Sequence, residues 1–400
     1  MQKTKIGHWY QPRKALSFIF SALILFNLSS CHKDSAITDV SGNIKLKKTS
    51  FNDLNGWNNE NFADIINVFA KNCEQINKNQ NTYTSAEHLK IKVSDLKAKC
   101  AKFAAQNINS SSKMKDFMES EFIPYAVTDD GKADGKFTSY YEAVINASYT
   151  QDSRYKYPIY GKPNDLVEIN LRDFDKDLPN TRLVGRVVGN KFVPYYNRRH
   201  IENNGISAPV IMWGDDLVDI HFMQIQGSAV AKMADGSEVR VGYADNNGHK
   251  FKGIGSILIN KGYIKPENSS MPKIREWLRN NPDKAADLMA ENERFIFQKI
   301  NNSSGPLGAF GVPLTAGRSL AVDTRYIPLG SILWLNTFDP DHRQINKIVF
   351  AQDIGSAIKG VVRGDYFWGH GEEALKHAGR MNSTGKYFII LPKETSIKAD

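Results

Sequence analysis

Our expectation for the fold of this chain rests mainly on one stretch, Ala351-Gln-Asp-Ile-Gly-Ser-Ala-Ile-Lys-Gly360-Val-Val-Arg-Gly-Asp-Tyr-Phe-Trp-Gly369. It continues the apolar run Ile348-Val-Phe-Ala351, so Asp353 lies at the end of a predicted strand. It then places Asp365 between Gly364 and an aromatic run. Short apolar runs that end at Gly, Pro or Asp are typical of β-barrels and β-sandwiches, not of doubly wound sheets.

The same texture continues on both sides of this stretch. We predict short strands at 319–322, 331–335, 347–351 and 386–391, and further strand-like runs at 137–142 and 167–171. Gly189-Asn190 separates two β-rich runs between Arg182 and Tyr196, which predicts a hairpin. The central and C-terminal parts are therefore predicted to be mainly β.

The region before them is predicted to be helical. From Phe51 to about Phe117 apolar residues recur at helical spacing, in one stripe from Leu54 to Phe69 and another from Leu89 to Phe103. A later helix is predicted to begin near Pro272, with Ser269 and Ser270 as caps.

Composition excludes several protein classes. The 400 residues are 41% hydrophobic and 24% charged, which is incompatible with a disordered chain, a collagen-like fibre or a polytopic membrane protein. The formal charge is +9, and it falls to +5 without the four basic residues of the first thirty. That mild excess suits an acidic polymer or surface but does not indicate nucleic-acid binding.

The N-terminus resembles a lipoprotein signal. Arg13-Lys14 precede an apolar run from Ala15 to Leu28, which is too short to cross a membrane, and Leu28-Ser-Ser-Cys31 resembles a lipobox. We expect a signal peptide at 1–30, lipidation of Cys31 and a polar tether at 31–50, with an ordinary cleaved signal as the alternative. The expected location is the bacterial cell envelope, lipid-anchored to the outer membrane and facing the periplasm.

Two cysteines remain after such processing. Cys73 and Cys100 both lie in predicted helices, and an oxidising envelope permits a disulfide between them. Buried free thiols are an equal alternative from the sequence.

Three aspartates are the candidates for chemistry. Asp323, Asp353 and Asp365 each stand beside glycines or apolar residues near a predicted strand end, and a small barrel can bring such positions together. A carboxyl that aromatic rings desolvate has a raised pKa, which favours Asp365 as a general acid. The alternative is that these aspartates cap turns.

Ordered motifs then resemble one family. Ala321-Val-Asp-Thr-Arg-Tyr-Ile-Pro-Leu-Gly330, the two aspartate motifs of 351–369, Met223-Gln-Ile-Gln-Gly-Ser228 and Gly242-Tyr-Ala-Asp-Asn-Asn-Gly248 resemble segments of the membrane-bound lytic murein transglycosylase A family, in the same order. The resemblance covers roughly residues 135 to 392 and includes that family's three-aspartate (3D) module.

This resemblance implies a fold and a division into domains. The expected fold is mainly β with accessory α: a double-psi β-barrel domain, an inserted smaller β domain and a helical N-terminal region. We expect residues 51–150 to hold the helical region and the first part of the barrel, 151–300 the inserted domain, and 301–393 the rest of the barrel.

The resemblance also implies an activity without a cofactor. The expected reaction is non-hydrolytic cleavage of the MurNAc-β-1,4-GlcNAc bond of peptidoglycan, which leaves 1,6-anhydro-MurNAc ends. By position, Asp365 is the catalytic acid and base, and Asp353 and Asp323 are supporting residues. Because the 6-hydroxyl of the sugar attacks, one acid suffices where ordinary glycosidases need two.

Substrate contacts are expected on the segments that match the family's cleft. The candidates are Thr138, Tyr140, Tyr141, Glu142, Gln226 and Ser228. The tyrosines suit sugar stacking, with core packing of a strand as the alternative. Ser139 and Ala143 replace residues that are usually Gly and Pro in the family.

Two other functions remain as alternatives. One is a non-catalytic peptidoglycan-binding lipoprotein, and the other is a hydrolase that pairs Asp365 with a second carboxylate such as Glu142. We expect no metal, because His370, Glu373 and His377 do not form the HExxH motif of zinc peptidases and suit a solvated helix face. The expected partners are glycan strands and a membrane surface, without nucleic acid, and the sequence does not identify protein partners.

Overall fold

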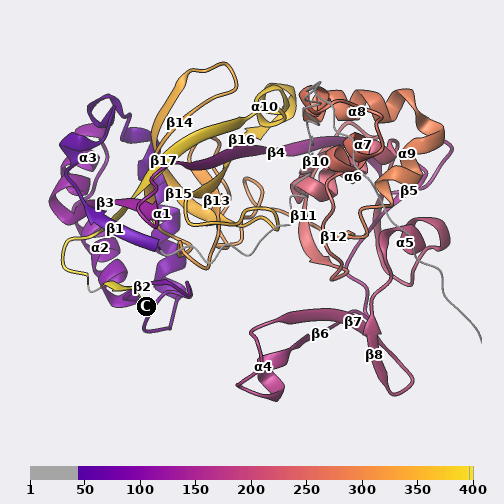
Figure 1. Cartoon of the computed structure of the whole chain (residues 1–400), viewed down its shortest axis with the longest axis horizontal. Helices are drawn as coiled ribbons and strands as arrows, with labels where there is room; N and C mark the ends of the chain where they lie inside the picture. Colours follow the sequence, from indigo (N-terminus) through magenta and orange to yellow (C-terminus); the bar gives the residue numbers. More distant parts are fainter. Residues whose placement is uncertain (1–43, 396, 400) are drawn as a thin grey trace, which may run out of the picture. The chain divides into compact units, whose positions relative to one another are not determined.

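The computed structural model describes residues 44–395 and 397–399. The predicted signal peptide, Cys31 and the tether up to residue 43 lie outside the described residues. Among the described residues, no helix combines the length and the apolar character needed to span a membrane. The architecture is mainly β with several helices, as predicted (Figure 1).

Six strands form a closed circuit of hydrogen-bonded neighbours. They are β4 (Gly135–Ser148), β13 (Ser319–Val322), β14 (Ile332–Phe338), β15 (Gln344–Asp353), β16 (Arg363–His370) and β17 (Asn382–Pro392). Their order is β17-β14-β15-β13-β16-β4, and the start of β17 pairs with the start of β4 to close the ring. All four strands predicted in the C-terminal part are confirmed.

The ring extends into an antiparallel ribbon and encloses an apolar core. The ribbon strands are β3 (Phe122–Asp129), which pairs with β17, and β1 (Ile44–Lys48), which pairs with β3. Side chains such as Phe137, Leu333 and Val349 are fully buried in this core. Alternate residues of the ring strands supply it, as the two-residue period of a strand requires.

The second half of β4 belongs to another set of strands. This set comprises β5 (Tyr157–Tyr160), β9 (Val210–Gly214), β10 (Ser228–Met233), β11 (Glu238–Asn246) and β12 (Ile296–Ile300). β10 pairs with β4 in parallel over Ala143–Ala147, and β9 pairs with its last two residues. One continuous strand therefore joins the ring to the strands of the middle region (Figure 1).

Helices and a small separate sheet complete the middle region. The sheet consists of β6 (Val167–Asn170), β7 (Arg182–Val188) and β8 (Lys191–Pro194), and its β7–β8 turn contains Gly189 at φ +60°, which confirms the predicted hairpin. The helices are α4 (Leu171–Phe174), α5 (Arg198–Asn204), α6 (Leu217–Gln226), α7 (Ile254–Asn260), α8 (Met271–Asn280) and α9 (Pro282–Met289). Helix α8 begins after Ser270 as predicted, but the Ser270 side chain makes no capping hydrogen bond.

The N-terminal region is mainly helical, but the first predicted stripe starts outside a helix, because the backbone of Leu54 is extended. It contains α1 (Ala63–Lys78), α2 (Val93–Ala105) and α3 (Ser111–Glu121), together with 3-10 turns at Phe51–Asp53 and Trp57–Asn59. Another 3-10 turn, Pro266–Asn268, lies in the middle region. Leu89, which we assigned to a helical stripe, instead belongs to strand β2 (Leu89–Ile91), which pairs with β18 (Ile397–Ala399). A Cys73–Cys100 disulfide joins α1 to α2 and decides between the two alternatives for these cysteines.

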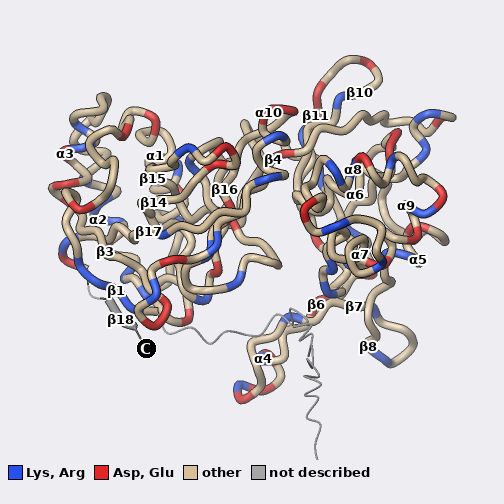
Figure 2. Tube along the Cα trace, turned by 45° about the horizontal axis from the view of Figure 1, so that its top comes forward, with Lys and Arg blue, Asp and Glu red and all other residues tan. Residues whose placement is uncertain are grey.

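Charges of both signs are interspersed along the described chain (Figure 2).

One buried ion pair connects the N-terminal region to the ring. The Arg318 guanidinium, just before β13, contacts both Glu60 oxygens at 2.9 Å, and Glu60 also accepts the Ile348 amide of β15 at 2.7 Å. The Glu60 side chain is 2% exposed, whereas Asp64, which also contacts Arg318, is 52% exposed.

Replacing these two acids is expected to have unequal effects on stability. Glu60→Gln leaves the buried Arg318 charge without its main partner, which should lower the free energy of unfolding by about 3 kcal/mol. Asp64→Asn removes an exposed partner of the same arginine and should cost about 0–1 kcal/mol. Urea unfolding of both variants and the wild type at neutral pH measures the difference, and equal losses would contradict the assignment.

Candidate active site

Strand register brings three candidate side chains into one row. Ala321 on β13 pairs with Asp353 of β15 on one side and with Asp365 of β16 on the other, and Asp365 pairs with Thr138 of β4. Register partners point to the same face of a sheet, so the two carboxyls and the hydroxyl share a face, with only the methyl group of Ala321 between the carboxyls. At about 4.8 Å per strand, the Cα atoms of the two aspartates lie about 10 Å apart.

Asp365 is partly exposed and has two side chains arranged behind it. The Thr138 hydroxyl donates a hydrogen bond to Asp365 Oδ1 and accepts one from Arg363 Nη2 at 2.8 Å. Burial raises the pKa of Asp365, while the Thr138 hydrogen bond and the Arg363 charge offset part of this rise. The carboxyl therefore keeps its proton to a higher pH than an ordinary aspartate, as a general acid requires.

Asp353 is held by donors on both oxygens. The Tyr140 hydroxyl donates to Oδ2 at 2.9 Å and the Ala309 amide donates to Oδ1 at 3.1 Å. Burial raises the pKa of Asp353 to about 6, against the lowering effect of these hydrogen bonds, and the nearby charge of Asp365 raises it further. The main cause of the raised pKa of Asp353 is therefore its burial, and the charge of Asp365 adds to it.

Asp323 has a different environment. It lies directly after β13, contacts Arg325 Nη2 at 2.7 Å and accepts the Gly360 amide at 2.8 Å. Burial opposes ionisation, but the hydrogen bonds of Arg325 and the Gly360 amide outweigh it, so the pKa of Asp323 is lowered. Asp323 is thus an ionised carboxylate that ties the segment after β13 to the segment before β16.

The aromatic surroundings of Asp365 differ from our expectation. Tyr366 and Trp368 alternate with Asp365 along β16, so they point to the opposite face of the sheet, where both pack against the ring core. The ring on the Asp365 face is Phe367, whose centroid lies 5.1 Å from that of Tyr140. The aromatic side chains on the Asp365 face are therefore Phe367 and Tyr140, in place of the whole run 366–368.

The remaining predicted contacts form a second group. Tyr141 is 2% exposed, and its hydroxyl accepts a hydrogen bond from Arg275 at 2.8 Å while its amide donates to Gln226 at 3.2 Å. Glu142 is 1% exposed and pairs with Arg240 at 2.9 Å. Ser228 is the first residue of β10 and is partly exposed. The structure brings Thr138, Tyr140, Asp353 and Asp365 together, but places the Tyr141 and Glu142 side chains in the interior.

Two parts of this site were missed in the sequence. Arg363 lies two residues before Asp365 on the same strand, so strand alternation alone puts both side chains on one face. The Ala309 amide comes from a loop 44 residues before Asp353, and no local pattern connects them.

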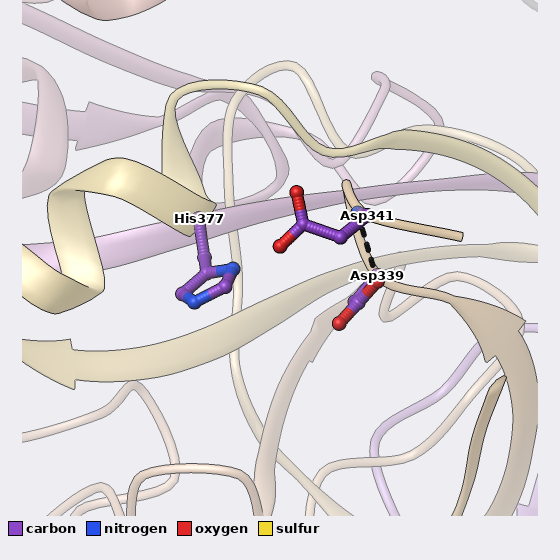
Figure 3. A group of neighbouring side chains, drawn as sticks. All are labelled: Asp339, Asp341 and His377. Carbon is purple, nitrogen blue, oxygen red and sulfur yellow. Dashed lines mark hydrogen bonds between the residues drawn. The ribbon is translucent and has the colours of Figure 1, made fainter. Parts of the chain in front are cut away.

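A possible metal-ligand group lies elsewhere in the described chain. Oxygen and nitrogen atoms of Asp339, Asp341 and His377 lie within 4.8 Å of one another (Figure 3). Arg343 and Arg380 each contact Asp341 at 2.9 Å, and the His377 ring stacks on Trp368 at 4.6 Å. These contacts explain why the three side chains lie together, because the loop that carries Asp339 and Asp341 packs against α10 (Gly371–Ala378). This is the helix predicted around Glu373 and His377.

Comparison with known proteins matches both halves of the chain. The MltA specific insert domain matches residues 136–299 and the 3D domain matches residues 318–391. The chain is 29% identical to membrane-bound lytic murein transglycosylase A of Escherichia coli K12 over 269 residues, or 65% of this chain and 67% of that protein. The crystal structure of MltA from Neisseria gonorrhoeae is 31% identical with a TM-score of 0.78, and covers 89% of this chain and 95% of its own.

A further solved structure agrees. The membrane-bound lytic murein transglycosylase from Agrobacterium tumefaciens is 28% identical with a TM-score of 0.78, over 87% of this chain and 98% of its own. The segment that matches the MltA specific insert domain contains Thr138 and Tyr140, and the segment that matches the 3D domain contains Asp353 and Asp365. The chain therefore belongs to the membrane-bound lytic murein transglycosylase A family.

Proposed function

We propose that this protein is a lytic transglycosylase that cleaves the MurNAc-β-1,4-GlcNAc bond of peptidoglycan and leaves 1,6-anhydro-MurNAc ends. The observation that carries the proposal is the partly exposed Asp365 with its raised pKa, next to a second carboxyl on the same face. The names of the relatives, which are lytic murein transglycosylases, support the same reaction class. The proposed roles are acid and base for Asp365 and support for Asp353 and Asp323.

The proposed reaction uses one proton twice. Asp365 donates its proton to the glycosidic oxygen, and the bond from that oxygen to C1 of MurNAc breaks. The 6-hydroxyl oxygen of the same MurNAc then forms a bond to C1 and returns its proton to the Asp365 carboxylate. No water is consumed, and the intramolecular attack supplies a high effective concentration of nucleophile.

Asp353 has a separate part in this scheme. Positive charge develops at C1 as the bond breaks, and a carboxylate on the same face can stabilise it. The Tyr140 and Ala309 hydrogen bonds fix both Asp353 oxygens, so the group needs little reorganisation during the reaction. Thr138, Tyr140, Gln226 and Ser228 are the partly exposed candidates for substrate contact, while buried Tyr141 and Glu142 are proposed to hold the framework.

A two-carboxylate hydrolase that uses Glu142 is the weaker reading. Glu142 lies four residues beyond Thr138 on β4, about 13 Å along the strand, whereas glycosidase carboxyls lie about 5–9.5 Å apart. Its contact with Arg240 at 2.9 Å also commits it to an ion pair. A binding protein without activity is disfavoured as well, because glycan binding alone has no need for a partly exposed carboxyl with a raised pKa.

We also propose the finer features of fold and location. The six-stranded circuit is taken as the double-psi barrel, with residues 151–300 as the inserted domain and 51–150 and 301–393 flanking it. Cys31 is proposed as the lipidated residue of an envelope lipoprotein at the outer membrane. The names of the relatives, which describe membrane-bound proteins, are consistent with this location.

Replacing the acid provides the direct test of function. Asp365→Asn keeps the shape of the side chain but cannot donate and recover the proton, so turnover should fall by at least about 100-fold. Mass spectrometry of digested sacculi should find anhydro ends with the wild type and none above background with the variant. Thermal unfolding at or above the wild-type temperature and retained sacculus binding exclude misfolding.

The products separate the alternatives. Reducing ends from the wild type would indicate the hydrolase, and binding without release would indicate the non-catalytic protein. Activity near the wild-type level in Asp365→Asn would assign the acid to another residue.

The raised pKa of Asp353 predicts a pH-dependent effect on stability. Because the folded state binds this proton more tightly than the unfolded state, the associated stability is present at low pH and is lost as pH rises from about 4 through about 6. Asp353→Asn removes that loss, so its stability relative to wild type should improve by about 2 to 3 kcal/mol between pH 4 and pH 8. Urea unfolding at both pH values measures this change.

An exposed aspartate serves as the control for this measurement. Asp134 is exposed, so Asp134→Asn should show a pH dependence of stability close to that of the wild type. A relative stability of Asp353→Asn that does not change with pH would mean that Asp353 titrates normally in the folded protein.

A further inference from the structure

We infer that Arg363 orients the acid Asp365 through the hydroxyl of Thr138, a role that rests on the function proposed above. Arg363 is thus a positioning residue, and Thr138 is the link between it and the carboxyl. Neither role was assigned to these residues from the sequence, which indicated Thr138 as a substrate contact.

The Arg363 guanidinium has a fixed orientation. Nη1 donates to the backbone carbonyls of Lys136, at 3.2 Å, and Gly364, which belong to the two paired strands β4 and β16. Nη2 donates to Thr138 Oγ1 at 2.8 Å. The planar guanidinium therefore rests on three acceptors of the β4–β16 pair, and its position follows from the strand register.

The hydroxyl of Thr138 carries this orientation to the acid. A hydroxyl has one hydrogen and two lone pairs, so accepting from Arg363 leaves its hydrogen for Asp365 Oδ1. A neutral carboxyl has one oxygen that accepts and one that carries the proton. With Oδ1 occupied as the acceptor, the transferable proton is confined to Oδ2, which is the geometry that a general acid needs.

The hydroxyl also separates two charges. An arginine in direct contact with an aspartate lowers the pKa of the carboxyl by about 1 to 3 units and keeps it ionised at neutral pH. Here the Arg363 charge acts across Thr138, and the burial of Asp365 outweighs it, so the pKa remains raised. Arg363 can therefore position the acid without removing its proton.

Other titratable groups also act on this site. Asp353 of β15 and Tyr140 of β4 interact electrostatically with Asp365, and β16 itself carries Arg363 beside Asp365 and His370 at its far end. Variants at Thr138 and Arg363 leave Asp353 and Tyr140 in place. A shift of the pH profile in those variants therefore reports on the Arg363–Thr138–Asp365 link.

A double-mutant cycle tests the inference on the full chain with sacculi as substrate. Thr138→Val keeps the β-branched shape without the hydroxyl, and Arg363→Gln removes the guanidinium. Each should lower kcat by about tenfold through misorientation of the acid, and the double variant should lose no more than either alone. Each should also move the alkaline limb of kcat/KM to higher pH, because both groups oppose the raised pKa of Asp365.

Two controls distinguish positioning from a structural role. Thr138→Ser keeps the hydroxyl and should restore the rate and the pH profile. Arg343→Gln changes the net charge equally at an exposed site and should behave like the wild type. Because the strand backbone is unchanged in Thr138→Ser and Thr138→Val, their comparison stands even if Arg363→Gln fails to fold.

Several outcomes would overturn the inference. Additive losses in the cycle, an unmoved alkaline limb, or Thr138→Val with wild-type kinetics would each show that Arg363 does not act through Thr138. Failure of the proposed function is distinguishable, because it appears in the wild type as reducing ends or as no release of fragments. If the wild type releases reducing ends, the cycle still tests the link on that cleavage.

Discussion

The pairing of β4 with two sets of strands is the constraint on which the site depends. Its first half pairs with β16 and β17 and closes the ring, and its second half pairs with β10 and β9. The alternation of side chains along it then assigns Thr138 and Tyr140 to the carboxyl face and Tyr141 to the interior. A slip of one residue against β16 would exchange these faces and separate both hydroxyls from their aspartates.

Within that frame, the identity of each neighbour decides the protonation of each aspartate. Asp323 contacts an arginine directly, and its pKa is lowered although it is buried. Asp365 has an arginine two residues away, but a hydroxyl lies between them, and its pKa is raised. Asp353 has only neutral donors and another carboxyl nearby, and its pKa rises to about 6. Three aspartates of one module thus divide into one with a lowered pKa and two with raised pKa values.

The sequence predicted Thr138, Tyr140, Asp353 and Asp365, but it did not predict Arg363, the Ala309 amide or the strand register. Apolar runs that end at an aspartate predicted the C-terminal strands, because burial and strand ends leave a local pattern. That Ala321 lies opposite both Asp353 and Asp365 depends on pairings between segments up to 44 residues apart, and closure of the ring pairs residues near 136 and 384. The position of the Tyr366 and Trp368 rings was wrong because desolvation was inferred from proximity in sequence, although side chains of a strand alternate between faces.

The N-terminal region contacts two of the strands on which the carboxyl row depends. Two carboxyls with raised pKa values destabilise the folded state at neutral pH. The row that contains them depends on the pairing of Ala321 on β13 with Asp353 on β15. The helical region contacts these two strands: Glu60 binds Arg318 before β13 and the Ile348 amide of β15, while Asn72 of α1 contacts Gln352, the neighbour of Asp353. These contacts are buried and polar, so they fix the relative positions of the segments that they join. The N-terminal region therefore holds β13 and β15 in the positions that place the two carboxyls in one row.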